Sequence, residues 1–87
     1  MRVVLILPLL ALATPALAGP QCTDLPEAQW LTKEQMMVHI EKLGHTVEVF
    51  KKTKGNCYEI YGRDKSGTRV EVYFHPITGK VVKATTL

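Results

Sequence analysis

The stretch at 57–75, CYEIYGRDKSGTRVEVYFH, decides the fold because it contains two alternating segments separated by a turn. Apolar residues recur at every second position on both sides of that turn, a pattern typical of strands with one buried face. One antiparallel register keeps the apolar residues of both strands together, and it pairs Gly62 with Val70, Ile60 with Val72 and Tyr58 with Phe74. The register leaves Lys65–Gly67 as the loop, with Gly67 at the last loop position, where a left-handed residue is needed. The sequence therefore predicts an antiparallel hairpin.

One further strand is predicted on each side of this hairpin. Upstream, His45–Phe50 has a period of two that places Val47 and Val49 on one face and Phe50 on the other. Downstream, Lys80–Thr85 is a short fourth strand. The connecting turns are predicted at Lys51–Asn56 and Pro76–Gly79. Strands joined in this order by short turns form an antiparallel meander.

A single helix precedes the strands. Thr32 and Gln35 form a capping box, which predicts that the helix begins at Lys33, and Gly44 is placed where a left-handed residue ends it. Its apolar stripe consists of Met36, Ile40 and Leu43, with Met37 beside them as core filler. The expected fold class is α+β, with one N-terminal helix packed on one face of a three- to four-stranded antiparallel sheet.

The first 18 of the 87 residues have the features of a secretory signal peptide. A positive start is followed by an apolar run that is too short to cross a bilayer, and Ala16–Ala18 offers a cleavage site. We therefore expect a signal peptide at 1–18, an extended arm at 19–29 and the domain at 30–87. The expected location is the periplasm or the exterior, with no stable membrane anchor after cleavage.

Charge and size exclude several functional classes. Export removes one arginine, so the net charge falls from +3 to +2, and the only basic cluster is Lys51, Lys52 and Lys54. A cluster of that size without interleaved aromatic residues does not predict nucleic-acid binding. The 69 residues that remain form a small core, for which a covalent crosslink is expected.

The two cysteines supply that crosslink. Export implies an oxidising compartment, so Cys22 and Cys57 are predicted to form a disulfide, whereas a zinc site or a catalytic thiol has no supporting motif. Strand phase places Cys57 on the face opposite the helix, although the arm with Cys22 leads into the helix. Either the arm wraps around the sheet or the phase slips at Cys57. The same pattern leaves open which face Trp30 and Phe50 cover.

The face of the hairpin that the helix leaves open is the candidate binding surface. The residues predicted there are Glu59, Tyr61, Arg63, Arg69, Glu71, Tyr73 and His75. Exposed tyrosines among arginines are typical of protein-binding sites, and the alternative is an ordinary solvated sheet face with cross-strand pairs. Unpaired edge strands would also allow a partner strand or a second copy to bind, giving a homodimer.

The sequence gives no indication of an enzyme, a metal site or a cofactor. The three histidines, His39, His45 and His75, lack ligand spacing, and no nucleophile motif or phosphate loop occurs. Glu59 and Glu71 are carboxylates that would lie near each other, but on an open face and not in a cleft. We therefore expect a binding protein and not a catalyst.

Five segments carry a resemblance to a known family: WLT at 30–32, LGHTV at 43–47, GNCYEIY at 55–61, DKSG at 64–67 and VEVYFHPITGKVV at 70–82. In this order they resemble the PepSY family, in particular small secreted bacterial proteins with a single such domain. The resemblance covers nearly all of the mature chain. It departs at His75, where the family usually has an acidic residue, which puts any role of that carboxylate in doubt.

The resemblance implies an extracytoplasmic protein with a helix on an antiparallel sheet and a proposed role in restraining proteases. Two functions from different classes follow. The first is a non-enzymatic module that inhibits or modulates a periplasmic or secreted protease. The second is an envelope accessory or sensory protein that binds a small ligand, a metal or a sensor domain, with Arg63, Arg69 and His75 suited to an anion.

Overall fold

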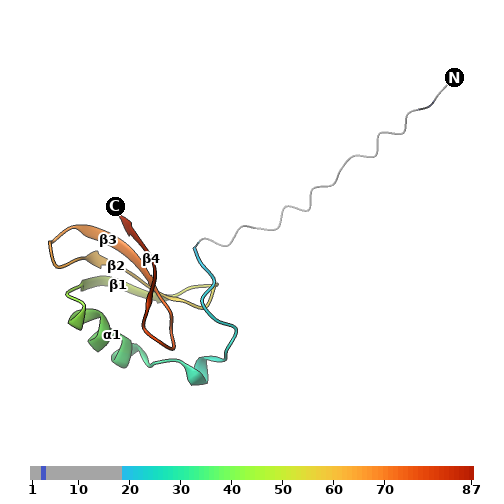
Figure 1. The fold of residues 1–87 in the computed structure, drawn as a ribbon, viewed down its shortest axis with the longest axis horizontal. Coiled ribbons are helices and arrows are strands. Elements are labelled where there is room, and N and C mark those ends of the chain that lie inside the picture. Colours follow the sequence, from blue (N-terminus) through green and yellow to red (C-terminus); the bar gives the residue numbers. More distant parts are fainter. Residues whose placement is uncertain (1–2, 4–18) are drawn as a thin grey trace.

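A computed structural model describes residue 3 and residues 19–87, so the predicted signal peptide lies outside the described residues apart from Val3. The elements in chain order are η1 (Glu27–Gln29), α1 (Lys33–Lys42), β1 (Thr46–Lys52), β2 (Tyr58–Arg63), β3 (Arg69–Phe74) and β4 (Val81–Thr86). The strands form one antiparallel sheet in the order β1-β2-β3-β4, and α1 lies across one face of it (Figure 1). The predicted α+β fold is confirmed, including its fourth strand.

The central hairpin has the predicted register. Gly62 pairs with Val70, Ile60 with Val72 and Tyr58 with Phe74. In the loop, the Asp64 carboxylate accepts hydrogen bonds from the backbone N–H groups of Ser66 and Thr68, at 2.9 and 3.0 Å. Gly67 has a φ of 81°, a left-handed conformation that favours glycine. Local turn chemistry therefore fixes this register.

The helix begins and ends as the sequence predicts. The Thr32 hydroxyl accepts from the Gln35 N–H, and the Gln35 side chain accepts from the Thr32 N–H, which completes the capping box. Met36 and Ile40 are fully buried, but Leu43 is 42% exposed, contrary to prediction. Leu43 is the C-cap residue and still has right-handed helical dihedral angles, and Gly44, with a φ of 91°, then turns the chain into β1. The apolar stripe of α1 therefore has its buried part at Met36 and Ile40 and ends before Leu43.

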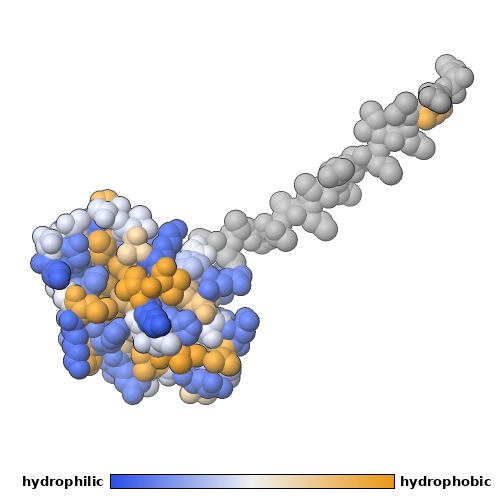
Figure 2. All heavy atoms as spheres, viewed as in Figure 1, coloured by the Kyte–Doolittle hydropathy of each residue, from blue (hydrophilic) through white to orange (hydrophobic). Residues whose placement is uncertain are grey.

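The core lies between α1 and the facing side of the sheet. It consists of Met36, Ile40, Tyr58, Ile60, Val70, Val72 and Phe74, with Trp30, Leu31, Val47 and Phe50 packed around it. Trp30 and Phe50 therefore cover the helix side, and their rings lie 5.5 and 5.0 Å from that of Tyr58, centroid to centroid. Every residue of β4 is exposed, and Figure 2 shows apolar side chains gathered over this strand. The helix therefore leaves β4 uncovered.

A bulge in β1 corrects the predicted strand phase. The pairing with β2 shifts between Val47 and Val49, so Glu48 is an extra residue in the ladder. Val47 and Phe50 consequently share the helix side, whereas Val49 is 48% exposed. The strand also continues to Lys52, which shortens the predicted turn. A period-two pattern cannot reveal such a bulge because one extra residue reverses the phase of everything beyond it.

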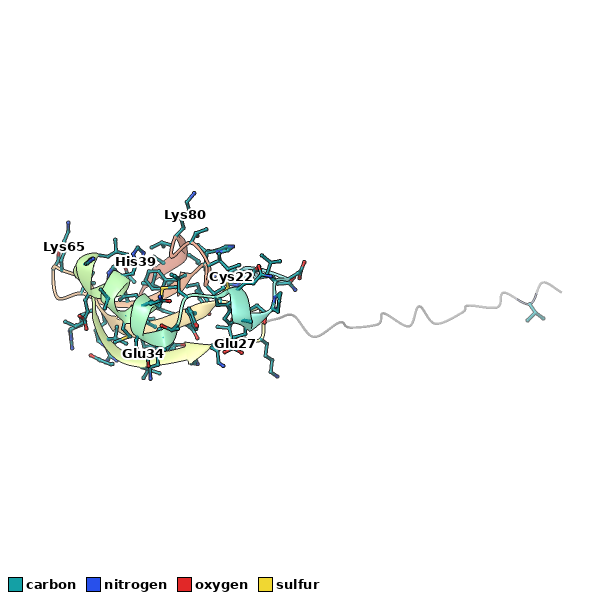
Figure 3. All side chains as sticks on the ribbon, turned by 90° about the horizontal axis from the view of Figure 1, so that it is seen from below. Cys22, Glu27, Glu34, His39, Lys65 and Lys80 are labelled. Atoms are coloured by element: carbon teal, nitrogen blue, oxygen red, sulfur yellow. A yellow bond between two sulfur atoms is a disulfide. The ribbon has the colours of Figure 1, made fainter. Side chains whose placement is uncertain are left out.

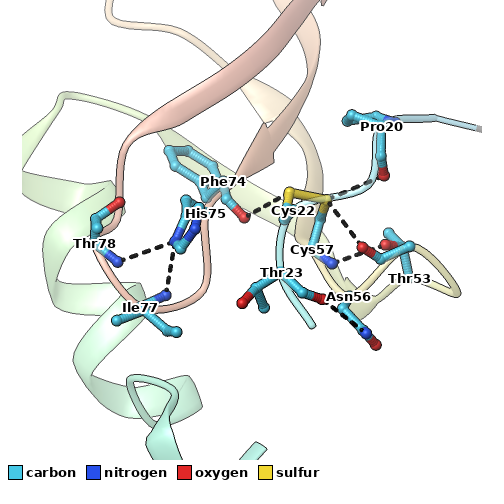
Figure 4. Close-up of a disulfide and its surroundings, with 11 residues drawn as sticks. Pro20, Cys22, Thr23, Thr53, Asn56, Cys57, Phe74, His75, Ile77 and Thr78 are labelled. Carbon is cyan, nitrogen blue, oxygen red and sulfur yellow. Dashed lines mark hydrogen bonds between the residues drawn. A yellow bond between two sulfur atoms is a disulfide. The ribbon is translucent and has the colours of Figure 1, made fainter. Parts of the chain in front are cut away.

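The arm wraps around one end of the sheet, which is the first of the two alternatives. Cys22 forms a disulfide with Cys57 (Figure 4). The Cys22 N–H also donates to the Gly55 carbonyl at 2.8 Å. A Cβ atom at Gly55 would lie 2.2 Å from the Pro20 carbonyl oxygen, so this backbone approach requires glycine. Further along, the Leu31 N–H donates to the Pro76 carbonyl at 2.9 Å. Backbone contacts thus hold the arm at both ends.

His75 organises the turn between β3 and β4. Its Nδ1 atom accepts from the backbone N–H groups of Ile77 and Thr78 at 3.2 and 3.3 Å, so this nitrogen carries no proton (Figure 4). The His39 ring is hydrogen-bonded to the Gly79 carbonyl oxygen of the same turn at 2.7 Å. A histidine nitrogen thus makes the turn contacts that a carboxylate oxygen would make.

Within residue 3 and residues 19–87, none of the helices has the length and apolar character needed to cross a bilayer.

Removal of the disulfide is expected to destabilise the domain by about 3 to 4 kcal/mol, because the disulfide closes a long loop and so restricts the unfolded chain. The sequence separation of the two cysteines is 35. Urea unfolding of the Cys22→Ala/Cys57→Ala variant should give this difference from wild type. Reductant should destabilise wild type by a similar amount and leave the variant unaffected. A loss well below about 1 kcal/mol would contradict the crosslink's predicted role.

The effect of replacing His75 on the free energy of unfolding should depend on whether the new side chain accepts hydrogen bonds. His75→Ala leaves two turn N–H groups without their acceptor, and we expect a loss of about 1 kcal/mol in unfolding free energy. His75→Asp supplies a carboxylate oxygen at the same place and should retain most of the stability. Urea unfolding at neutral pH compares the two. An Asp variant as unstable as the Ala variant would show that the acceptor role is unimportant.

Candidate functional site

The face of the sheet opposite α1, here called the open face, carries rows of side chains from neighbouring strands. One row is Lys51, Glu59, Tyr73 and Lys83, and the next is Val49, Tyr61, Glu71 and Thr85. Arg63 and Arg69 pair at the far end of the hairpin. The predicted residues of β2 and β3 therefore do share one face. His75 lies past the end of β3, where its ring is engaged in the turn.

The end of the open face near the disulfide is covered. Glu59 and Tyr73 are only 3% and 6% exposed, so the prediction of two exposed tyrosines is wrong for Tyr73. The arm is the cause, because a Cβ atom at Gly19 would lie 2.7 Å from the Tyr73 ring. Lys51 completes the cover, with its Nζ atom 3.4 Å from the Glu59 carboxylate and 5.2 Å from the centre of the Tyr61 ring. Tyr61 itself is half-buried.

The opposite end of the open face is accessible. Arg63 and Arg69 are exposed and lie opposite each other, an arrangement in which like charges repel. The bulge residue Glu48 lies between them, with carboxylate oxygens 3.6 Å from Arg63 Nε and 3.7 Å from Arg69 Nη2. The bulge in β1 thus adds a side chain to the site that the sequence analysis did not include.

The phenols and carboxylates of the open face shift one another's pKa values. The pKa of Tyr73 is raised far above its ordinary value, first by hydrogen bonding to Glu71 and then by hydrogen bonding to Glu59. The pKa of Tyr61 is also raised, chiefly by the negative charge of Glu59. Hydrogen bonding from Tyr73 lowers the pKa of Glu71. A carboxyl group whose pKa is lowered is a poor proton donor at neutral pH, so Glu71 is unsuited to act as a general acid.

The histidines have structural contacts. His39 and His45 lie on the Phe74 ring in edge-to-face geometry, at centroid distances of 6.4 and 6.3 Å. Among residue 3 and residues 19–87, histidine, cysteine and acidic side chains form no group of three that could hold a metal ion.

A groove on the helix side, of about 590 Å³, was missed by the sequence analysis. Its lining includes Trp30, Leu31, Phe50 and Tyr58, together with Glu27, Lys33, Lys51 and Lys52. The volume falls within the range of small-ligand sites. The groove could not be foreseen because the predicted phase of β1 set Phe50 opposite Val47 and left open which face Phe50 covers. The one sequence feature that could have indicated the groove is the pair Lys51 and Lys52 next to the aromatic residue Phe50.

The raised tyrosine pKa values predict a measurable titration. Tyr58, Tyr61 and Tyr73 all have pKa values above the ordinary 10.0, so the native state favours the neutral phenols. The associated stability is fully present below pH 10 and is lost as the pH rises through the folded-state values. Absorbance at 295 nm should therefore show no native tyrosine with a midpoint at pH about 10. Glu71→Gln should lower the midpoint of Tyr73. A single midpoint near pH 10 in wild type would contradict this geometry.

Comparison with known proteins identifies the family. The profile described as PepSY_2, "Peptidase propeptide and YPEB domain", matches residues 2–85. No curated protein matches the sequence significantly, and no solved structure matches the fold significantly. The match extends over nearly the whole chain and agrees with the helix-and-meander architecture. The chain therefore belongs to the PepSY family, which is linked to protease propeptides and protease inhibition and is typically non-catalytic and extracytoplasmic.

Proposed function

We propose that the protein is an exported, non-enzymatic module that binds a protease in the periplasm or outside the cell and restrains it. The observation that carries this proposal is the match of residues 2–85 to a family linked to protease propeptides and protease inhibition. The disulfide supports it, because a crosslinked small domain suits an oxidising compartment that contains proteases. A rigid domain also loses little conformational entropy on binding.

The accessible end of the open face is the proposed contact surface. Tyr61 is half-buried, and Arg63 and Arg69 are exposed beside it. Tyrosine and arginine are the residue types that most often dominate binding energy at protein interfaces. Tyr73 and Glu59 support this surface from beneath the arm and do not contact a partner directly.

The alternative of an anion-binding accessory protein has weaker support. Glu48 already lies between the two guanidinium groups and offsets their positive charge. His75 is held in the turn by two backbone hydrogen bonds. The groups that suggested an anion are therefore engaged with the protein itself.

The test is a titration of secreted and periplasmic protease activity from the source organism against the mature, disulfide-intact protein. We expect stoichiometric inhibition with a peptide or casein substrate. The Tyr61→Ala/Arg63→Ala/Arg69→Ala variant should inhibit at least about tenfold more weakly, because it lacks the interface side chains. Lys42→Ala, an exposed change on α1, is the matched control and should inhibit like wild type.

Two results would contradict the proposal. The first is the absence of inhibition against every protease activity in those fractions. The second is inhibition by the triple variant that is as strong as inhibition by wild type. This result would show that the open face is not part of the protease-binding surface. Circular dichroism and urea unfolding of each variant separate lost binding from lost folding.

A further inference from the structure

The groove on the helix side lies along an edge of the sheet. β1 is the first strand in the sheet order, so its outer edge has no neighbouring strand within the described residues. The apolar floor of the groove contains Trp30, Phe50 and Tyr58, which are fixed in place by their contacts with one another. Trp30 is further held by a hydrogen bond from its indole N–H to the Leu25 carbonyl at 3.0 Å. The floor is therefore preformed.

The backbone of β1 presents hydrogen-bonding groups beside this floor. The Thr53 N–H donates to the Cys57 carbonyl, so Thr53 directs its backbone groups toward β2. In an antiparallel ladder this direction alternates, so Lys51 points inward while Lys52 and Phe50 point outward. No backbone partner for Phe50 or Lys52 on the outer side occurs within 19–87. An extended peptide could pair with these groups while one of its side chains enters the groove.

The charges around the groove indicate what kind of peptide fits. Lys33 and Lys52 lie in its lining, against one carboxylate, Glu27, which already forms an ion pair with Lys52. The ammonium group of Lys51 lies on the open face beside Glu59 and does not count toward the groove. Lys33 places its Nζ atom 5.6 Å from the centre of the Phe50 ring. Lysines on an edge strand disfavour pairing with a second copy of the same edge, because like charges would face each other. They favour an acidic strand instead.

We propose that the outer edge of β1 binds an extended acidic peptide segment by strand addition, with one large apolar side chain of that segment in the groove. Main-chain pairing supplies affinity in this mode, and the pocket and the lysines supply selectivity. This site is separate from the open face, and the inference goes beyond the proposed function because the segment need not belong to a protease.

Trp30 is the only tryptophan of the chain and lines the groove, so its fluorescence reports occupancy directly. The probe is the acetylated and amidated heptapeptide Glu-Thr-Glu-Phe-Glu-Thr-Glu, which contains no tryptophan. We expect a saturable change in Trp30 emission. Three matched peptides serve as controls: Lys in place of every Glu, Ala in place of Phe, and N-methylated backbone amides. Each should bind at least about tenfold more weakly, since each removes one component of the recognition.

Lys33→Glu is the informative protein variant. The residue is exposed, and an acidic side chain in the first turn of α1 suits the helix dipole, so the fold should be retained. This variant should bind the acidic peptide more weakly than wild type does and the lysine peptide more tightly. Lys65→Glu makes the same charge change in the β2–β3 loop, at the opposite end of the molecule from Cys22 and Glu27 (Figure 3), and should leave both affinities unchanged.

Four results would overturn the proposal. One is the absence of any saturable response to the acidic peptide, and another is equal affinity for acidic and basic peptides. Undiminished binding of the N-methylated peptide would show a side-chain pocket without strand pairing. Self-association of the protein that the peptide disperses, measured by sedimentation, would assign the edge to a second copy. None of these results bears on inhibition through the open face, so this proposal and the protease proposal can fail separately.

Discussion

The Cys22–Cys57 disulfide holds the N-terminal arm across one end of the sheet, and the surfaces of the molecule follow from that crossing. On one side of the crossing, Gly19 lies against Tyr73 and closes part of the open face. On the other side, the arm leads to Trp30 and the groove beside β1. A small domain has little apolar burial with which to fix such a segment, so a covalent bond and a few backbone contacts do so. Without that anchor, the arm would no longer cover Tyr73 on the open face or hold Trp30 beside β1.

The bulge at Glu48 is the second constraint with consequences on both faces. On the open face, it places a carboxylate between Arg63 and Arg69 and so balances a like-charge pair. On the helix side, it turns Phe50 toward Tyr58, where it becomes part of the groove floor. One inserted residue therefore shapes both candidate sites. Bulges of this kind commonly reorient side chains near functional surfaces.

The sequence predicted those features that depend on neighbouring residues. The register of the hairpin, the left-handed Gly67 and the capping box at Thr32 are set within a few positions along the chain, so local chemistry was sufficient. The burial of Tyr73 depends on Gly19, far away in sequence, and no periodic pattern encodes that contact. The phase of Phe50 failed for a different reason, because alternation does not reveal an inserted residue. The predicted residues of β2 and β3 therefore share one face, whereas His75 lies in the following turn and the arm covers Glu59 and Tyr73.

The two edges of the sheet differ in a way that bears on function. The ladders of both edge strands contain a register shift, but β1 carries two adjacent lysines, whereas β4 has one lysine and exposes Val81 and Val82. Charge and bulging prevent indiscriminate strand pairing, so an edge that has both and also adjoins a preformed aromatic groove combines protection with selectivity. β4 exposes an apolar surface, contributes no residue to the groove beside β1 and carries a single lysine. At β1, the lysines and the bulge exclude unsuitable strands, and the adjoining groove admits a particular side chain. We distinguish β1 from β4 as a recognition edge because β1 combines both kinds of feature.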